Sequence, residues 1–169
     1  MRACLIGEAC QRIAQLSAGE ARIVALKQMA EAYESGVVGA GRLPAYAALM
    51  RAAALVALGA GANDPDVPAA LAAIETALGV PDARESHFEP VATRAAAILV
   101  KALAAGEDMT APAAAADVLY AAGWKRTGDI EALERSSDFL TFLSDMLPDS
   151  RKGAWLDGLT RKLDELAAS

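Results

Sequence analysis

The sequence predicts an all-α fold of about eight helices in antiparallel hairpins, and three observations carry this prediction. Apolar residues recur every three or four positions along most of the chain, which is the spacing of a buried helix face. Alanine, the strongest helix former, is by far the most frequent residue. No stretch of strand length alternates polar and apolar residues convincingly. Because 169 residues suffice for one domain with a sizeable core, residues 1–169 are expected to form a single helical domain.

The first hairpin is predicted to comprise helices at about 2–16 and 19–35. In the first helix, four apolar residues lie on one stripe: Leu5, Ala9, Ile13 and Leu16. The second helix is expected to turn a similar set inward: Ile23, Leu26, Ala30 and Tyr33. Ser17 and Glu20 have the spacing of a capping box before this second helix. The glycine-rich stretch 35–43 has no apolar period and is predicted to be a loop.

The second hairpin is predicted at 44–59 and 67–79, where Pro44 suits a first helical turn and Gly79 a helix stop. Turn-forming residues at 63–66 separate the two helices.

The third hairpin is predicted at 90–105 and 111–123. Pro90 stands where a helix opens, and Thr110 is suited to cap the second helix. Gly123 is read as the stop of that helix, as Gly79 is for its counterpart.

The last hairpin is predicted at 130–147 and 151–167. The first of its helices is strongly amphipathic, with an apolar side formed by Phe139, Phe142, Leu143, Met146 and Leu147. The second carries a stripe of leucines: Leu156, Leu159, Leu163 and Leu166. This stripe is interpreted as core, with a seam for self-association as the alternative, because its spacing is close to that of a coiled coil.

An internal repeat is suggested by the offset of 43 residues between Arg51 and Arg94, each of which begins a similar alanine-rich segment. With one inserted residue, further positions align: Asp64 with Asp108, Pro68 with Pro112, and Gly79 with Gly123. The hypothesis is a set of hairpin repeats at 44–80, 90–124 and 130–167, stacked as a short α-solenoid. The alternative is an irregular helical bundle whose alanine-rich helices align by chance.

Charge and length limit the partners and the location. The formal net charge is −6 and the sequence pI about 4.8, which disfavours nucleic acid and anionic membrane surfaces. The longest apolar run, 52–62, is about half the length of a membrane span. Cys4 and Cys10 lie on one predicted helix, six residues apart, where they cannot form a disulfide. A cytoplasmic protein without a membrane segment is expected.

No group of residues indicates catalysis, so no catalytic residue, cofactor or metal is predicted. His87 is the only histidine, and it stands in a predicted loop. Asp64 and Asp66 lack the glycine and glutamate of a calcium loop. The glycines of the stretch 36–41 lack the order of a phosphate-binding loop.

Two tryptophans at helix ends are the candidate partner-binding residues. Trp124 is followed by Lys125 and Arg126, and Trp155 follows another basic pair. Tryptophan and arginine dominate binding hot spots, although tryptophan also fills gaps between helices and cations also favour a helix C-terminus.

The resulting functional hypothesis is a non-catalytic protein-protein interaction or regulatory module that presents helix surfaces to a protein partner or to a second copy of the chain. The alternative is a small-molecule-binding helical domain, or a helical enzyme, with an apolar pocket between hairpins.

Overall fold

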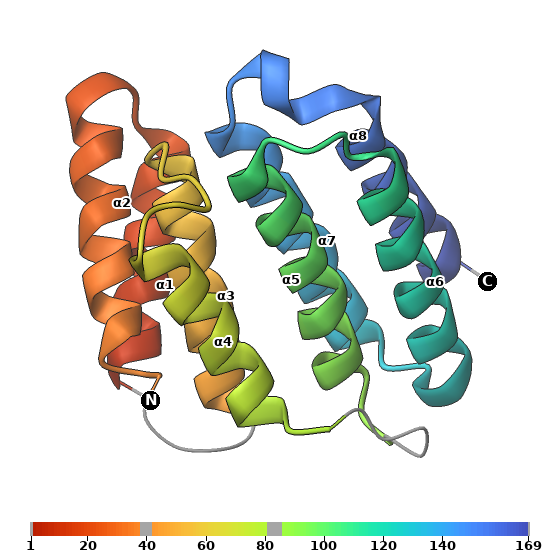
Figure 1. Cartoon of the computed structure of the whole chain (residues 1–169). Helices are drawn as coiled ribbons and strands as arrows, with labels where there is room; N and C mark the ends of the chain where they lie inside the picture. The colour runs from red at the N-terminus through yellow and green to blue at the C-terminus, as the bar shows by residue number, and fades with distance from the viewer. Residues whose placement is uncertain (1, 38–41, 81–85, 169) are drawn as a thin grey trace. The chain divides into compact units, whose positions relative to one another are not determined.

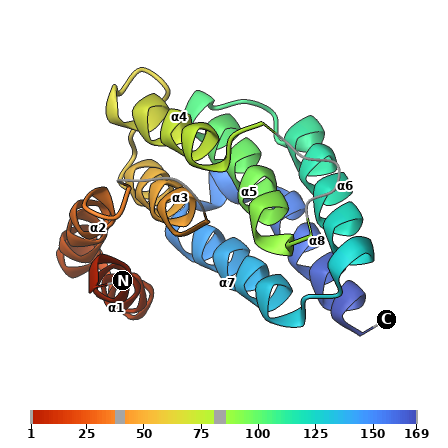
Figure 2. The ribbon, with the colours of Figure 1, turned by 90° about the horizontal axis from the view of Figure 1, so that it is seen from below.

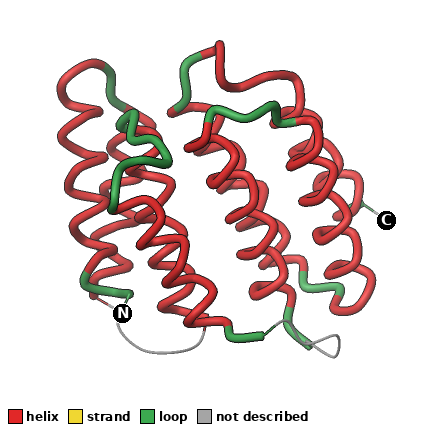
Figure 3. The backbone as a smooth tube through the Cα atoms, in the orientation of Figure 1, coloured by secondary structure: helices red, strands yellow, loops and turns green. Residues whose placement is uncertain are grey.

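The computed structural model describes residues 2–37, 42–80 and 86–168, and over these residues every regular element is an α-helix (Figures 1 and 3). The predicted all-α fold is confirmed. The helices are α1 (Arg2–Leu16), α2 (Gly19–Glu34), α3 (Arg42–Ala57), α4 (Asp66–Leu78), α5 (Phe88–Ala105), α6 (Thr110–Thr127), α7 (Ile130–Met146) and α8 (Asp149–Ala167). Consecutive helices pack in the predicted pairs, α1 on α2, α3 on α4, α5 on α6 and α7 on α8.

The helices group into two compact units, with α1–α4 in Met1–Gly79 and α5–α8 in Val80–Ser169. The expectation that residues 1–169 form one domain stays a prediction.

The first unit is an open row of helices. Its main packing contacts run from α1 to α2, from α2 to α3 and from α3 to α4. The central helix α3 buries mostly small residues, and six of its alanines are completely inaccessible: Ala45, Ala47, Ala48, Ala52, Ala53 and Ala54. Alanine lets neighbouring helices approach closely, and each such contact buries little apolar surface.

The second unit is a closed ring of four helices. Here α5 packs on α6 and α7, while α8 packs on α6 and α7 in turn, so each helix has two principal neighbours (Figure 2). The four helices carry bulky side chains that are almost fully buried: Phe88, Leu99, Tyr120, Leu133, Leu140, Phe142, Leu143 and Leu156. The predicted apolar side of α7 is confirmed, and three of the four leucines of the α8 stripe are buried within the chain: Leu156, Leu159 and Leu163.

The predicted end of α6 at Gly123 is wrong, because this helix continues to Thr127. Gly123 lies inside the helix, where an added Cβ would stand 3.0 Å from the Phe88 ring. Its lack of a side chain therefore serves close packing of α6 on α5. The residue that ends α6 is Gly128, which has the left-handed φ of 59°.

The predicted capping box at Ser17 and Glu20 is also not formed. The N-cap of α2 is Ala18, without a side-chain hydrogen bond, and the backbone turns into the helix through Gly19 at φ 57°. Ser17 contributes its carbonyl oxygen, which accepts a hydrogen bond from Arg22 Nε at 2.9 Å.

The two hairpins α3–α4 and α5–α6 match in some of the aligned positions and differ in others. The turns before α4 and α6 are alike: Asp64 Oδ1 accepts from Asp66 N and Asp108 Oδ1 accepts from Thr110 N, both at 3.1 Å. Thr110 was predicted to cap α6, but it is the first residue of the helix, and the N-cap is Met109. Ile74 and Val118 have the same 44-residue offset as these aligned positions but differ in burial, since Ile74 is buried and Val118 is 68% exposed.

The register explains that difference. The turns before α4 and α6 align at an offset of 44 residues, but the buried residues of the two helices align at an offset of 46. The buried residues are Val67, Ala70, Ile74 and Ala77 in α4, and Ala113, Ala116, Tyr120 and Gly123 in α6. Two residues rotate a helix face by about 200°. The hypothesis of a structural repeat is therefore supported by the similar turns and by the similar alanine-rich segments of α3 and α5, and it stays a prediction.

Candidate functional site

The outer face of α1 carries a continuous row of exposed apolar side chains, which we call the α1 stripe: Leu5, Ile6, Ala9, Ile13 and Leu16. The exposed fractions are 62% for Leu5, 50% for Ile6, 51% for Ile13 and 89% for Leu16. Single exposed apolar residues are ordinary, but a row along a whole helix is typical of a binding surface.

The sequence pattern placed four of these residues on one stripe but did not predict that the stripe is exposed. The buried face of α1 is instead formed by small residues: Cys4, Gly7, Cys10 and Ala14. At Gly7, a Cβ would lie 2.4 Å from the ring of Tyr33 on α2. The aromatic ring of α2 thus occupies the space that a side chain on α1 would fill, and α1 turns its larger residues to solvent.

The outer face of α2 is different in character. It is exposed and charged, with Glu20, Lys27, Glu31 and Glu34. Ile23, expected to point inward, is 48% exposed, and Val24 beside it is similarly exposed. The other three residues expected inside α2, Leu26, Ala30 and Tyr33, are buried. The apolar surface of the first hairpin is therefore concentrated on α1.

Cys4 and Cys10 are buried free thiols on the face of α1 that meets α2. Burial raises the pKa of both thiols, so they stay protonated and unreactive at neutral pH. Both thiols fill space between the two helices.

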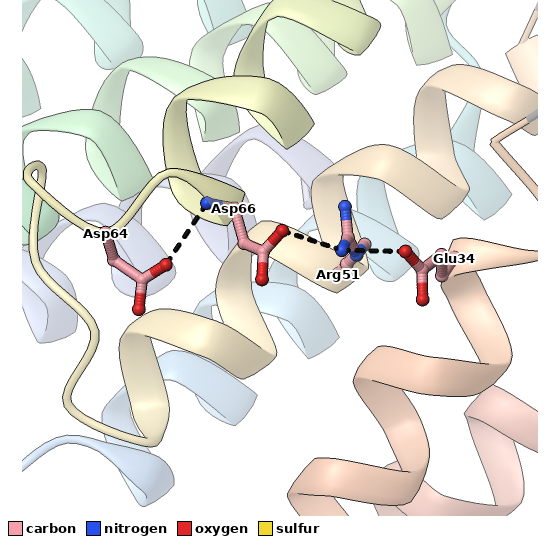
Figure 4. Close-up of polar contacts among 4 residues, drawn as sticks. All are labelled: Glu34, Arg51, Asp64 and Asp66. Atoms are coloured by element: carbon pink, nitrogen blue, oxygen red, sulfur yellow. Dashed lines mark hydrogen bonds and ion pairs between the residues drawn. The ribbon is translucent and has the colours of Figure 1, made fainter.

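A polar cluster holds α2, α3 and α4 together on the surface of the first unit (Figure 4). Arg51 Nη2 on α3 donates to Glu34 Oε1 at 3.0 Å and to Asp66 Oδ1 at 3.2 Å. Asp66 is the first residue of α4, where a carboxylate is favoured by the helix dipole. Each of these groups has a structural partner, so the cluster supports the row of helices and has no free group for chemistry.

The α7–α8 hairpin has an open groove of about 280 Å³ on its surface. It is lined by Leu133, Glu134, Ser137, Asp138, Leu163, Asp164 and Ala167. Ser137 Oγ donates to Asp164 Oδ1 at 3.4 Å. This groove lies within a hairpin and is acidic at its rim, whereas the sequence-based alternative expected an apolar pocket between hairpins.

The predicted partner-binding residues do not come together. Lys125 and Arg126 are exposed in the last turn of α6 and Trp124 is half-buried beside them, while Trp155 is half-buried on α8. Helices α6 and α8 run in parallel (Figure 1), and Lys162 contacts Asp117 between them. Trp124 lies seven residues after Asp117 and Trp155 seven residues before Lys162, so the tryptophans are separated by about 21 Å along the helices.

The part of the chain that the structure describes contains no cluster of three or more His, Cys, Asp or Glu that could hold a metal ion. His87 is exposed at the N-cap position of α5. Of the glycine-rich stretch 36–41, residues 38–41 lie outside the described residues, as do the side chains of Arg151 and Lys152 before Trp155. Among the described helices, none is long and apolar enough to cross a membrane.

Comparison of the chain with family models, with curated proteins and with solved structures gave no match in any of the three.

Sequence reasoning missed the exposure of the α1 stripe, and one signal could have revealed it. The buried residues of the face opposite the stripe are all small, and they include Gly7. A glycine in the middle of a helix costs stability unless another element approaches it closely. Gly7 therefore marked the face of α1 that packs on a neighbour.

Proposed function

We propose that this protein is a non-catalytic protein-protein interaction module and that the α1 stripe is its binding surface. The observation that supports this most strongly is the exposure of four large apolar side chains along one helix, with Leu16 at 89%. Helices that present such a row bind partners through residues spaced three or four apart.

The chemistry of the surface favours a protein partner. The stripe itself contains no charged residue, so it offers neither phosphate recognition nor acid-base chemistry. The acidic net charge opposes binding to nucleic acid or anionic lipid. We further propose that the protein acts in the cytoplasm, which is consistent with two free thiols that remain unpaired.

The test compares three baits in extracts of the native cell: the wild type, the double variant Leu5→Ser/Leu16→Ser, and the control Val118→Ser. Val118 is an exposed apolar residue of α6 outside the stripe, so the control matches the chemistry of the change. We expect a protein at fixed stoichiometry with the wild type and the control, and its loss with the stripe variant.

The partner is then purified, and its affinity for the three forms is measured by titration calorimetry. Far-UV circular dichroism establishes that all three forms are equally folded. Equal affinity for the wild type and the stripe variant would contradict the proposed function.

A further inference from the structure

The α1 stripe is self-complementary in the order of its side chains. Leu5 and Leu16 lie near its two ends and share one edge, while Ile6 and Ile13 share the other edge. Ala9, the smallest member, lies between them. If two such helices pack in opposite directions, large residues at one end meet large residues at the other, and the alanines allow the helices to approach in the middle.

Charge is also arranged in a way that suits this pairing. Glu8 and Arg12 are both exposed and lie about 40° apart around α1, on the edge of the stripe that carries Leu5 and Leu16. In an antiparallel helix pair, residues on the same edge of each helix face one another. With Leu5 opposite Leu16 of the second copy, Glu8 comes within one residue of the level of Arg12 of that copy, and the reverse pair follows by symmetry.

We propose that the α1 stripe binds the same stripe of a second copy of this chain, antiparallel and about a two-fold axis. This inference rests on the proposed function and names its partner. An isologous contact of this kind uses one surface patch twice and closes at two copies. The Glu8 and Arg12 pairs set the direction of the helices, because a parallel arrangement would not place these two edges opposite each other.

The size of the stripe determines how tight the dimer is. Four half-exposed or more exposed aliphatic side chains amount to a few hundred Å² of apolar surface. A stable dimer buries roughly 800 Å² on each partner, so the stripe alone gives a weak association that depends on concentration. Monomer and dimer should therefore exchange in the micromolar range.

The experiment is sedimentation equilibrium of the full chain, from low micromolar to near-millimolar concentration. We expect the wild type to pass from monomer to dimer and to stop there. Leu16→Ser should weaken the dimer by about tenfold or more, because the most exposed side chain of the stripe is truncated. Val118→Ser should leave the dissociation constant unchanged.

The charge pairs give a second readout that a folding defect does not mimic. Glu8→Arg alone and Arg12→Glu alone each place like charges opposite one another and should weaken the dimer by about tenfold. The double variant Glu8→Arg/Arg12→Glu should recover the affinity of the wild type, since the pairs are reversed. Raising the salt concentration should reduce the difference among the four proteins.

A single monomer mass for the wild type over the whole range would overturn the inference, and so would a dimer that Leu16→Ser or the single charge variants leave unchanged. Such a result is distinguishable from failure of the proposed function. If the bait experiment still retains a different protein through the stripe, the interaction module stands and only the second copy is excluded. If it retains none, both proposals fail.

Discussion

The two units bury their helices in different ways. In the second unit each helix packs mainly on two others in a closed ring, and its helices bury many large residues, such as Phe142 and Leu143. In the first unit the helices form an open row, and its contacts are made largely by small residues such as Ala14 and Ala52. In the closed ring each described helix has two principal neighbours, whereas α1, at the end of the open row, has one, α2.

That difference explains where the α1 stripe comes from. The principal neighbour of α1 among the described helices, α2, presents the ring of Tyr33, which leaves no room for a side chain at Gly7. The larger residues of α1 then lie on the side without a neighbour inside the unit. In an open row, the apolar residues of the end helix α1 thus form an exposed face, although the same pattern of residues would suit a buried one.

The largest expected effect is in the closed ring. Phe142 is completely buried on α7, so Phe142→Ala should lower the free energy of unfolding by about 3–5 kcal/mol. Urea unfolding followed by circular dichroism measures it. A loss under about 1 kcal/mol would mean that the ring collapses around the cavity or is less well packed than its burial indicates.

The next effect concerns the close approach of α1 and α2. Gly7→Ala places a methyl group within 2.4 Å of the Tyr33 ring, and we expect a loss of about 1–3 kcal/mol. Gly158→Ala on α8 is the matched control, because nothing lies within 4 Å of its Cβ. There the substitution should stabilise by roughly 0.5–1 kcal/mol through helix propensity. Chemical unfolding of both variants checks the opposite signs.

Helix caps provide a smaller contrast between the units. Asp129 is the N-cap of α7, and its carboxylate accepts a hydrogen bond from Ala132 N at 3.1 Å. Asp129→Ala should cost about 1 kcal/mol. Ser17→Ala before α2 should change the midpoint of thermal unfolding very little, because the capping box is not formed there. Equal losses in the two variants would show that Ser17 caps α2 after all.

The smallest effect at neutral pH is the contribution of buried hydroxyls and thiols. Burial raises the pKa of Tyr120, whose hydroxyl has no hydrogen-bond partner among the described residues, above its ordinary value of 10.0. The folded state therefore keeps a proton that the unfolded state releases, so this stability is fully present below about pH 10 and is lost as pH rises further.

Thermal unfolding between pH 7 and alkaline pH measures this loss. Tyr120→Phe should leave the neutral-pH stability almost unchanged and make the alkaline decline shallower. A decline as steep as that of the wild type would assign it to other groups, of which Tyr33 and the two cysteines have pKa values raised by burial in the same direction.

The sequence was sufficient for the number, order and pairing of the helices, because proline, glycine and apolar spacing mark helix ends and faces locally. It predicted the apolar side of α7 correctly, because the side of a helix that carries five large apolar residues is the side that is buried. The prediction failed where a helix end or a buried face depends on the packing of a neighbouring helix. In the sequence Gly123 has the pattern of a helix end, but in the structure it makes room for Phe88. The stripe of α1 has the pattern of a core face, but the face that packs on Tyr33 is the one that contains Gly7.

The candidate site could not be predicted from local sequence patterns, because it depends on how the helices pack. Trp124 and Trp155 were predicted from their residue type, but their separation depends on the direction of α6 relative to α8, which only the structure shows. Exposure of Leu16 likewise follows from the packing of α1, which has one principal neighbour, α2, among the described helices of its unit.

The most direct test of an outward-facing α1 stripe compares two adjacent residues of this helix, Ile13→Asn and Ala14→Asn. Ile13 is half exposed, whereas Ala14 is completely buried. Unfolding free energies are measured at submicromolar concentration, below the range in which the proposed dimer forms. We expect Ile13→Asn to cost less than about 1 kcal/mol and Ala14→Asn at least about 2 kcal/mol, because the second change buries and crowds a polar amide. The reverse order would show that the stripe is the core face of α1 and would contradict both proposals.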